Sequence, residues 1–231
     1  WSDDNNKKIT NLTSFADTFL EKSHLLRMIT NYTVLAESTK SLMVLRPYQF
    51  YATESIVNQV KNSNENGYIW HTTGSGKTLT SFKASQILID IPDVHKVVFV
   101  VDRRDLDYQT TKEFNSFSDG SVDGTNNTQA LVKQFGDDTK LLVTTIQKLN
   151  NAISNNRYGD TMRKLQNERI IFIFDECHRS QFGETHKRIK QYFNNNQMFG
   201  FTGTPIFAEN AIGNTTTKTL FGDCLHKYVI T

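Results

Sequence analysis

A glycine-bearing stretch, Thr73-Gly-Ser-Gly-Lys-Thr78, has the composition and setting of a phosphate-binding loop. An apolar, β-prone run ends just before it, and a segment compatible with a helix follows from Leu79. Backbone N–H groups can wrap phosphate oxygens only where no Cβ blocks the approach, and the start of a helix adds free N–H groups. In this chemistry Lys77 reaches the β- and γ-phosphates of a nucleoside triphosphate, and the Thr78 hydroxyl binds Mg²⁺. The residues expected to hold the nucleotide here are Thr73, Gly74, Ser75, Gly76, Lys77 and Thr78.

An acidic pair, Asp175 and Glu176, follows directly after the apolar run 170–174. Mg²⁺ prefers hard oxygen ligands and keeps much of its water shell, so one carboxylate beside Thr78 and the phosphates can suffice. Glu176 has the chemistry to orient and deprotonate an attacking water. Acidic pairs also cap strand ends without any catalytic role, and the phosphate loop upstream is what favours the catalytic interpretation. We expect Lys77, Asp175 and Glu176 to be catalytic, with Thr78 and Asp175 holding Mg²⁺.

The elements that position these groups alternate between two kinds. Apolar runs at 68–70, 96–101, 140–145, 170–174 and 198–201 predict strands, and the segments between them have helical character. Strands that are continuously apolar and separated by helices predict a central, mostly parallel sheet with helices on both faces, an α/β fold. Ligands bind at the carboxyl ends of strands in such sheets. The helices are expected at 47–60, 77–90, 105–117, 128–135, 147–153, 160–166 and 185–193. No fold is predicted after Pro205.

Several classes of protein are excluded by composition. The chain has 231 residues, 22% charged and 37% hydrophobic, with a net charge of +2 that argues neither for nor against nucleic acid. No apolar run approaches the roughly 20 residues that a membrane crossing needs. Two cysteines are too few for a disulfide framework, which favours a reducing, cytoplasmic location.

The first 44 residues have a different pattern. Residues 1–11 are polar, and after them Phe15, Phe19, Leu26 and Ile29 recur at near-helical spacing. This spacing predicts one or two amphipathic helices that pack on the domain that follows. Because the chain begins at Trp1 rather than Met, we expect it to be part of a longer protein.

Three short motifs resemble those of superfamily 2 helicases and translocases. Asp175-Glu-Cys-His178 resembles the DExH form of motif II, Thr202-Gly-Thr-Pro205 resembles motif III, and Arg46-Pro-Tyr-Gln49 looks like the upstream adenine-recognition motif. More narrowly, the combination resembles the motor (R) subunit of type I restriction enzymes. The matching pieces are His71-Thr-Thr-Gly-Ser-Gly-Lys-Thr78, Val101-Asp-Arg-Arg-Asp-Leu106 with Gln109, Thr144-Thr-Ile-Gln-Lys148, Asp175-Glu-Cys-His-Arg-Ser180, Gly200-Phe-Thr-Gly-Thr-Pro205 and Phe221-Gly-Asp223 with His226-Lys-Tyr228. His71 replaces the first glycine of the usual loop, a departure that this family also has.

The resemblance implies a role for further residues. Gln49 would read the adenine edge, since its amide supplies a donor and an acceptor. Residues that would touch the nucleic-acid backbone are Asp102, Arg103, Thr144 and Thr145, although capping of strand ends is an alternative for them. Residues that would sense the γ-phosphate and couple it to DNA are His178, Thr202, Gly203 and Thr204.

The resemblance also implies an activity and partners. Residues 45–231 would be the first RecA-like lobe, and 1–44 a helical lead-in from an upstream nuclease domain. ATP and Mg²⁺ would drive translocation of duplex DNA, and the nuclease domain would then cut it. The implied partners are duplex DNA, the modification and specificity subunits, a second RecA-like lobe and the nuclease domain, with no membrane.

Parts of such an enzyme are missing from the sequence. It has neither the Gln-x-x-Gly-Arg-x-x-Arg pattern of a second lobe nor the nuclease carboxylates with their lysine. Arginine fingers contribute on the order of 10³-fold or more, so the fragment alone is expected to be nearly inactive.

Four alternatives remain open at this stage. They are a DExH RNA helicase, a type III restriction subunit, a nucleotide-dependent scaffold without hydrolysis, and a metabolic P-loop kinase. Intact Lys77, Asp175 and Glu176 disfavour the scaffold, and Thr202-Gly-Thr-Pro205 disfavours the kinase.

Overall fold

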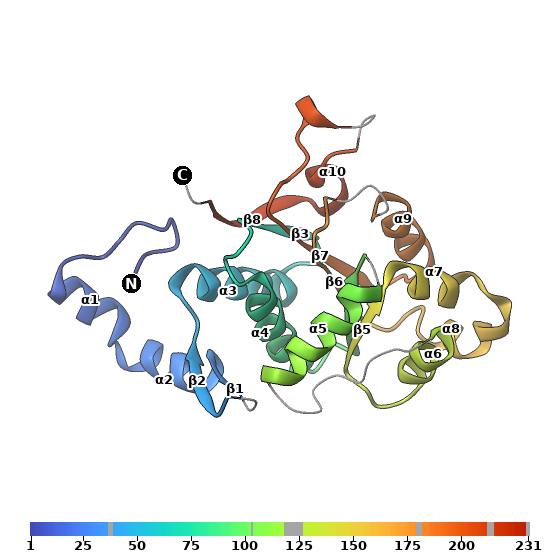
Figure 1. Cartoon of the computed structure of the whole chain (residues 1–231), viewed down its shortest axis with the longest axis horizontal. Helices are drawn as coiled ribbons and strands as arrows, with labels where there is room; N and C mark the ends of the chain where they lie inside the picture. The colour runs from blue at the N-terminus through green and yellow to red at the C-terminus, as the bar shows by residue number, and fades with distance from the viewer. Residues whose placement is uncertain (37–38, 103, 118–126, 179–181, 212–214, 230–231) are drawn as a thin grey trace.

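A single parallel sheet forms the centre of the structure, a computed structural model that describes residues 1–36, 39–102, 104–117, 127–178, 182–211 and 215–229 (Figure 1). Its six strands run in the order β5-β4-β6-β7-β3-β8, and every neighbouring pair is parallel. They are β3 (Gly67–His71), β4 (Lys96–Val101), β5 (Leu141–Thr145), β6 (Ile170–Phe174), β7 (Asn196–Thr202) and β8 (Asp223–Tyr228). The predicted α/β class with a mostly parallel sheet is confirmed.

Helices cover both faces of this sheet, as predicted. Successive side chains of a strand point to opposite faces, and β4 shows this directly, because Val97 and Phe99 enter one core while Val98 and Val100 enter the other. The first core is covered by α3 (Pro47–Asn62), α4 (Lys77–Ile89) and α5 (Arg104–Phe117). The second is covered by α6 (Thr128–Gly136), α7 (Ile146–Ser154), α8 (Gly159–Lys164), α9 (Phe182–Tyr192) and α10 (Thr217–Phe221). Burial on both faces explains why the strand sequences are continuously apolar.

Helix α3 lies beside α4 and begins where the sequence predicts (Figure 1). Pro47 occupies its first turn, where a missing N–H costs no hydrogen bond. Its predicted inner face is buried, and the residues on it are Tyr48, Ala52, Ile56 and Val60. The helix therefore presents Tyr48 and the adjoining Gln49 at the edge of the sheet that carries the loop.

The N-terminal region contains α1 (Leu12–Phe19), α2 (Lys22–Asn31) and an antiparallel hairpin, β1 (Thr33–Ala36) with β2 (Ser41–Val44). The hairpin was not predicted. The expected packing of the helices was wrong in part, because Leu26 and Ile29 are 59% and 62% exposed. Met28 and Tyr32, four residues apart and so on one face, enter the core instead. Leu26 and Ile29 therefore face away from the domain, whereas Phe19 packs against the core.

The C-terminal region, for which the sequence predicted no fold, completes the sheet. A short 3-10 turn, Ala208–Asn210, leads to α10, and β8 then pairs with β3 at the edge. Gly222 joins α10 to β8 with φ of +78°, a conformation that glycine adopts without strain. Within the described residues, no helix is both long and apolar enough to cross a bilayer.

Candidate nucleotide-binding site

The loop between β3 and α4 has the backbone that phosphate binding needs. Gly74 and Gly76 have φ of +80° and +79°, and Gly76 caps the start of α4. A side chain at either position would be strained. The Ser75 N–H donates to the Thr72 carbonyl at 3.2 Å, which closes the turn. The free N–H groups of the first turn of α4 therefore lie beside the loop.

Two side chains from α3 hold the loop through its carbonyl groups. The Tyr48 hydroxyl donates to the Ser75 carbonyl at 2.9 Å, and Gln49 Nε2 lies 3.3 Å from the carbonyl oxygens of both Ser75 and Gly76. Gln49 Oε1 accepts from the Arg46 N–H at 2.9 Å. These two side chains therefore fix the peptide groups of Ser75 and Gly76.

The predicted catalytic residues lie together at this loop. Lys77 Nζ is 3.2 Å from Glu176 Oε1, and the Asp175 carboxylate accepts from the Glu176 N–H at 3.0 Å. Burial, and then the neighbouring Glu176, raises the pKa of Asp175 to about 6, and Lys77 acts against this rise. Glu176 has φ of +47°, which is uncommon for a residue with a Cβ. The carboxyl end of β6 therefore delivers both carboxylates to the loop, as expected for a parallel sheet.

The donor groups of this site fit a magnesium nucleotide. Among the described residues, Thr72 Oγ1 and Ser75 Oγ are buried and have no hydrogen-bond partner. The described part of the chain contains no group of three or more His, Cys, Asp or Glu that could hold a metal. Thr78 and Asp175 would therefore supply only part of a coordination shell, which suits an ion that keeps water and phosphate ligands.

The expected coupling residues form a chain of contacts that ends at the catalytic pair. His178 Nδ1 lies 2.9 Å from Thr202 Oγ1 and 3.4 Å from Glu176 Oε2, and the Thr204 N–H donates to Thr202 Oγ1 at 3.0 Å. A Cβ added to Gly203 would lie 3.3 Å from Thr73 Oγ1. The segment after β7 therefore packs closely against the phosphate loop.

The residues expected to contact DNA are less accessible. Thr144 and Thr145 are buried at the carboxyl end of β5, and Asp102 is 9% exposed at the end of β4. The Thr145 hydroxyl accepts from the Lys148 N–H at 3.3 Å and caps α7. Arg103 lies outside the described residues. The DNA-contact role of these four residues stays a prediction.

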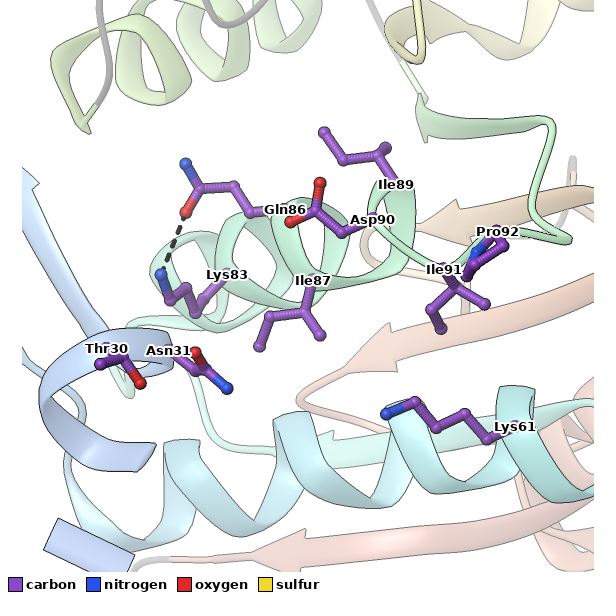
Figure 2. A pocket seen from close by; sticks show the side chains of 10 residues that line it. All are labelled: Thr30, Asn31, Lys61, Lys83, Gln86, Ile87, Ile89, Asp90, Ile91 and Pro92. Atoms are coloured by element: carbon purple, nitrogen blue, oxygen red, sulfur yellow. Dashed lines mark hydrogen bonds between the residues drawn. The ribbon is translucent and has the colours of Figure 1, made fainter. Parts of the chain in front are cut away.

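A separate groove lies between α2, α3 and α4, away from these groups (Figure 2). It has a volume of about 620 Å³, and Lys83 lies on its wall. The Lys83 ammonium donates to Gln86 Oε1 at 3.3 Å and to the Thr33 carbonyl at 3.2 Å, and burial lowers its pKa. This groove contains none of the predicted catalytic residues.

A glycine-bearing loop between a strand and a helix, with two carboxylates at the carboxyl edge of a parallel sheet, defines a RecA-like P-loop lobe. A family model described as SWI2/SNF2 ATPase matches residues 48–231. A type I restriction enzyme endonuclease subunit of Staphylococcus saprophyticus is 53% identical over the whole chain. The C-terminal part of such a subunit from Mycoplasma pneumoniae is 46% identical over 84% of this chain and 99% of that protein.

One solved structure supports the fold. A nuclease-deletion mutant of the Type ISP restriction-modification enzyme LlaGI, in complex with a DNA substrate mimic, superposes with a TM-score of 0.61 and 20% identity. The match covers 81% of this chain and 20% of that one. The chain belongs to the SWI2/SNF2 ATPase family, among the endonuclease subunits of type I restriction enzymes. It spans 25% of the length of the staphylococcal relative.

Proposed function

We propose that this chain is the ATP-binding motor lobe of a type I restriction endonuclease subunit, which drives translocation of duplex DNA that leads to cleavage by a separate nuclease domain. The observation that carries the proposal is the meeting of Lys77, Asp175 and Glu176 at a loop shaped for phosphates. The match of residues 48–231 to the SWI2/SNF2 ATPase family supports the same proposal.

The residues of the site divide the chemistry between them. Residues 73–78 would hold the phosphates, and Thr78 with Asp175 would hold Mg²⁺. When bound, MgATP supplies the phosphoryl group and the free energy of its hydrolysis. Lys77 neutralises phosphate charge, and the Glu176 carboxylate orients and deprotonates the attacking water once Lys77 has turned away from it.

The adenine and the DNA would be contacted from two other places. Gln49 already uses Oε1 and Nε2 within the protein, so an adenine contact needs the second lone pair of Oε1, or an Nε2 hydrogen that leaves one of the two loop carbonyls. Asp102, Arg103, Thr144 and Thr145 would follow the DNA backbone without reading sequence. His178, Thr202, Gly203 and Thr204 would connect the state of the γ-phosphate with that contact, since His178 lies beside Glu176.

The whole enzyme would supply what this lobe lacks. The staphylococcal relative is about four times as long as this chain, so the additional length could contain a second RecA-like lobe and a nuclease domain. Within this chain, the proposed boundary divides the lead-in, 1–44, from the lobe, 45–231. Modification and specificity subunits would set the target sequence. The solved LlaGI enzyme, a restriction-modification enzyme in complex with a DNA substrate mimic, supports DNA as the substrate.

The test is the ATPase activity of the protein at its full natural length, with and without duplex DNA. Wild type is compared with Lys77→Ala and Glu176→Gln. Stimulation by duplex DNA that both substitutions abolish is the expected result. Stimulation by RNA alone would instead favour an RNA helicase, and nucleotide binding without hydrolysis would favour a scaffold.

A further inference from the structure

The edge strand β8 touches the phosphate loop and its supports at three points. The Thr72 N–H, at the start of the loop, donates to the Tyr228 carbonyl at 3.1 Å. His226 Nδ1 lies 2.9 Å from Nε2 of His71, the last residue of β3. The Tyr228 ring stacks on the Tyr48 ring with 3.8 Å between centroids and 8° between planes. Two alternate residues of one strand therefore face the loop from the same side.

The stacked tyrosines connect β8 with the middle of the loop. Tyr48 is buried, and its hydroxyl donates to the Ser75 carbonyl at 2.9 Å. The Tyr228 ring covers the Tyr48 ring in parallel, which limits where the Tyr48 hydroxyl can point. Tyr228, far from Ser75 in the sequence, therefore helps to fix the position of Ser75 through Tyr48.

The two histidines connect β8 with the first residue before the loop. Burial lowers the pKa of both rings, that of His71 to about 3, with smaller effects from His226 and then Lys77. Both rings are therefore neutral near pH 7, and one ring N–H donates to the ring nitrogen of the other. His71 is fully buried, so a lost partner would leave a polar atom away from water. A glycine at this position, as in the usual loop, would have no side chain for β8 to hold.

We propose that His226 and Tyr228 of β8 are positioning residues for the nucleotide-binding loop, which fix the backbone at Thr72 and Ser75 so that the loop is ordered before the phosphates arrive. The strand is itself held on its outer side, because Asn6 Nδ2 donates to the Lys227 carbonyl at 2.8 Å. A preordered loop binds more tightly, since less conformational freedom is lost on binding. This inference rests on the proposed function, because it takes the loop that β8 positions to be one that binds nucleotide.

The experiment measures the affinity of the protein, at its full natural length, for fluorescently labelled ADP with Mg²⁺. His226→Leu removes the hydrogen bond to His71, and an unpaired buried group corresponds to a loss of affinity of about tenfold. His226→Asn places a polar atom near the position of Nδ1 and should restore most of the affinity. Tyr228→Leu removes the stacking and should weaken binding several-fold, whereas Tyr228→Phe keeps the ring and should rescue it.

A matched control comes from the neighbouring residue of the same strand. Leu225 directly precedes His226, and its side chain fills the space beside Gly67 at the start of β3. Leu225→Ala should lower the melting temperature without weakening ADP binding. In steady-state ATPase assays the His226→Leu and Tyr228→Leu variants should raise KM for ATP more than they lower kcat.

Three outcomes would overturn the inference. Wild-type affinity in His226→Leu and Tyr228→Leu would show that β8 does not position the loop, while the proposed function would stand. Equal losses of ADP affinity in Leu225→Ala would show that general destabilisation of β8 is the cause. Failure of the wild type to bind ADP would contradict the proposed function itself, and the inference with it. If His226→Leu does not fold, the Tyr228→Leu and Tyr228→Phe pair decides the question.

Discussion

Lys77 and Glu176 form an ion pair across the mouth of the phosphate loop, with 3.2 Å between Nζ and Oε1. In the proposed reaction these two groups act on different partners, the lysine on phosphate and the glutamate on water. Their contact means that phosphate and carboxylate compete for one ammonium group. Glu176 also has a left-handed backbone conformation, which costs about 1–3 kcal/mol and is typical of functional sites.

Glu176→Gln should separate binding from hydrolysis. The amide keeps the shape of the side chain but removes its charge, so Lys77 is free to meet phosphate, and nucleotide affinity should be unchanged or higher. The loss of a general base should lower kcat about 10²- to 10⁴-fold. Fluorescence titration with labelled ADP and a steady-state ATPase assay give the two quantities. A kcat close to that of wild type would remove Glu176 from the role of base.

Lys96→Met should destabilise the fold without touching the site. The buried Lys96 ammonium donates to the carbonyls of Gln134, Asp137 and Thr139 at 3.1, 2.7 and 2.6 Å, at the end of α6. Methionine fills similar space but removes the ammonium that binds these three carbonyl groups, which should cost about 2–4 kcal/mol in the free energy of unfolding. Urea denaturation measures this cost.

The control for Lys96→Met is Lys133→Met on the exposed face of α6. It removes the same charge and should change the free energy of unfolding by less than about 0.5 kcal/mol. Equal losses of stability in the two variants would mean that the change in net charge, rather than the loss of the Lys96 hydrogen bonds to the three carbonyls, is responsible. Affinity for ADP should stay unchanged in both.

The elements that the sequence predicts well are those with an unambiguous local pattern. Strands β4 and β6 are continuously apolar and lie in the centre of the sheet, and α3 shows its buried face as a clear helical repeat. The N-terminal stripe of Leu26 and Ile29 has the same kind of repeat but is exposed, because Met28 and Tyr32 make the contact with the core. Periodicity therefore identifies the helix but does not decide which side of it packs.

Some contacts of the site also follow from the fold class, and others could not be predicted from the sequence. Lys77, Asp175, Glu176, His178 and Thr202 meet because parallel strands end at one edge, which follows from the fold class. The contact between His71 and His226 depends on β8 pairing with β3 across a sequence separation of 155 residues. The strand that brings them together is half polar and lies at the edge of the sheet, so no local pattern predicts it.

His71 should make the fold sensitive to acid. Its pKa is about 3 in the folded protein, below the ordinary value of 6.5, because the ring is buried. The unfolded chain takes up a proton as pH falls below about 6.5 and the folded chain does not, so this stabilisation is present above pH 6.5 and is lost on the way down to pH 3. The slope from one such group is at most about 1.4 kcal/mol per pH unit.

Urea denaturation at pH 7.5 and pH 5 measures that slope in wild type and in His71→Gln. Glutamine keeps a polar group near Nε2 but does not titrate, so the variant should lose less stability between the two pH values. The groups that face His71 are His226, Lys77, Tyr48 and Tyr228, and burial also lowers the pKa of His226. An identical pH dependence in the two proteins would assign acid sensitivity to other groups.

Gly203→Ala should weaken the connection between the loop and the segment after β7. An added Cβ would lie 3.3 Å from Thr73 Oγ1 and 3.4 Å from the His71 carbonyl oxygen, so the neighbours must give way by a few tenths of an ångström. The stability change should be about 1 kcal/mol or less, since no positive φ is involved. Because Thr202 and Thr204 would move with Gly203, the stimulation of ATPase by duplex DNA should fall several-fold, while ADP affinity changes less.

Gly200→Ala is the comparison that tests this assignment. Its Cβ would lie 2.5 Å from the sulfur of the buried Cys177 and 3.2 Å from the Phe221 ring, both in the second core. That overlap should lower the free energy of unfolding by about 1–3 kcal/mol. If Gly200→Ala reduces DNA stimulation as much as Gly203→Ala does, loss of packing explains both. If only Gly203→Ala reduces it, the close approach of Gly203 to Thr73 is what transmits the state of the site.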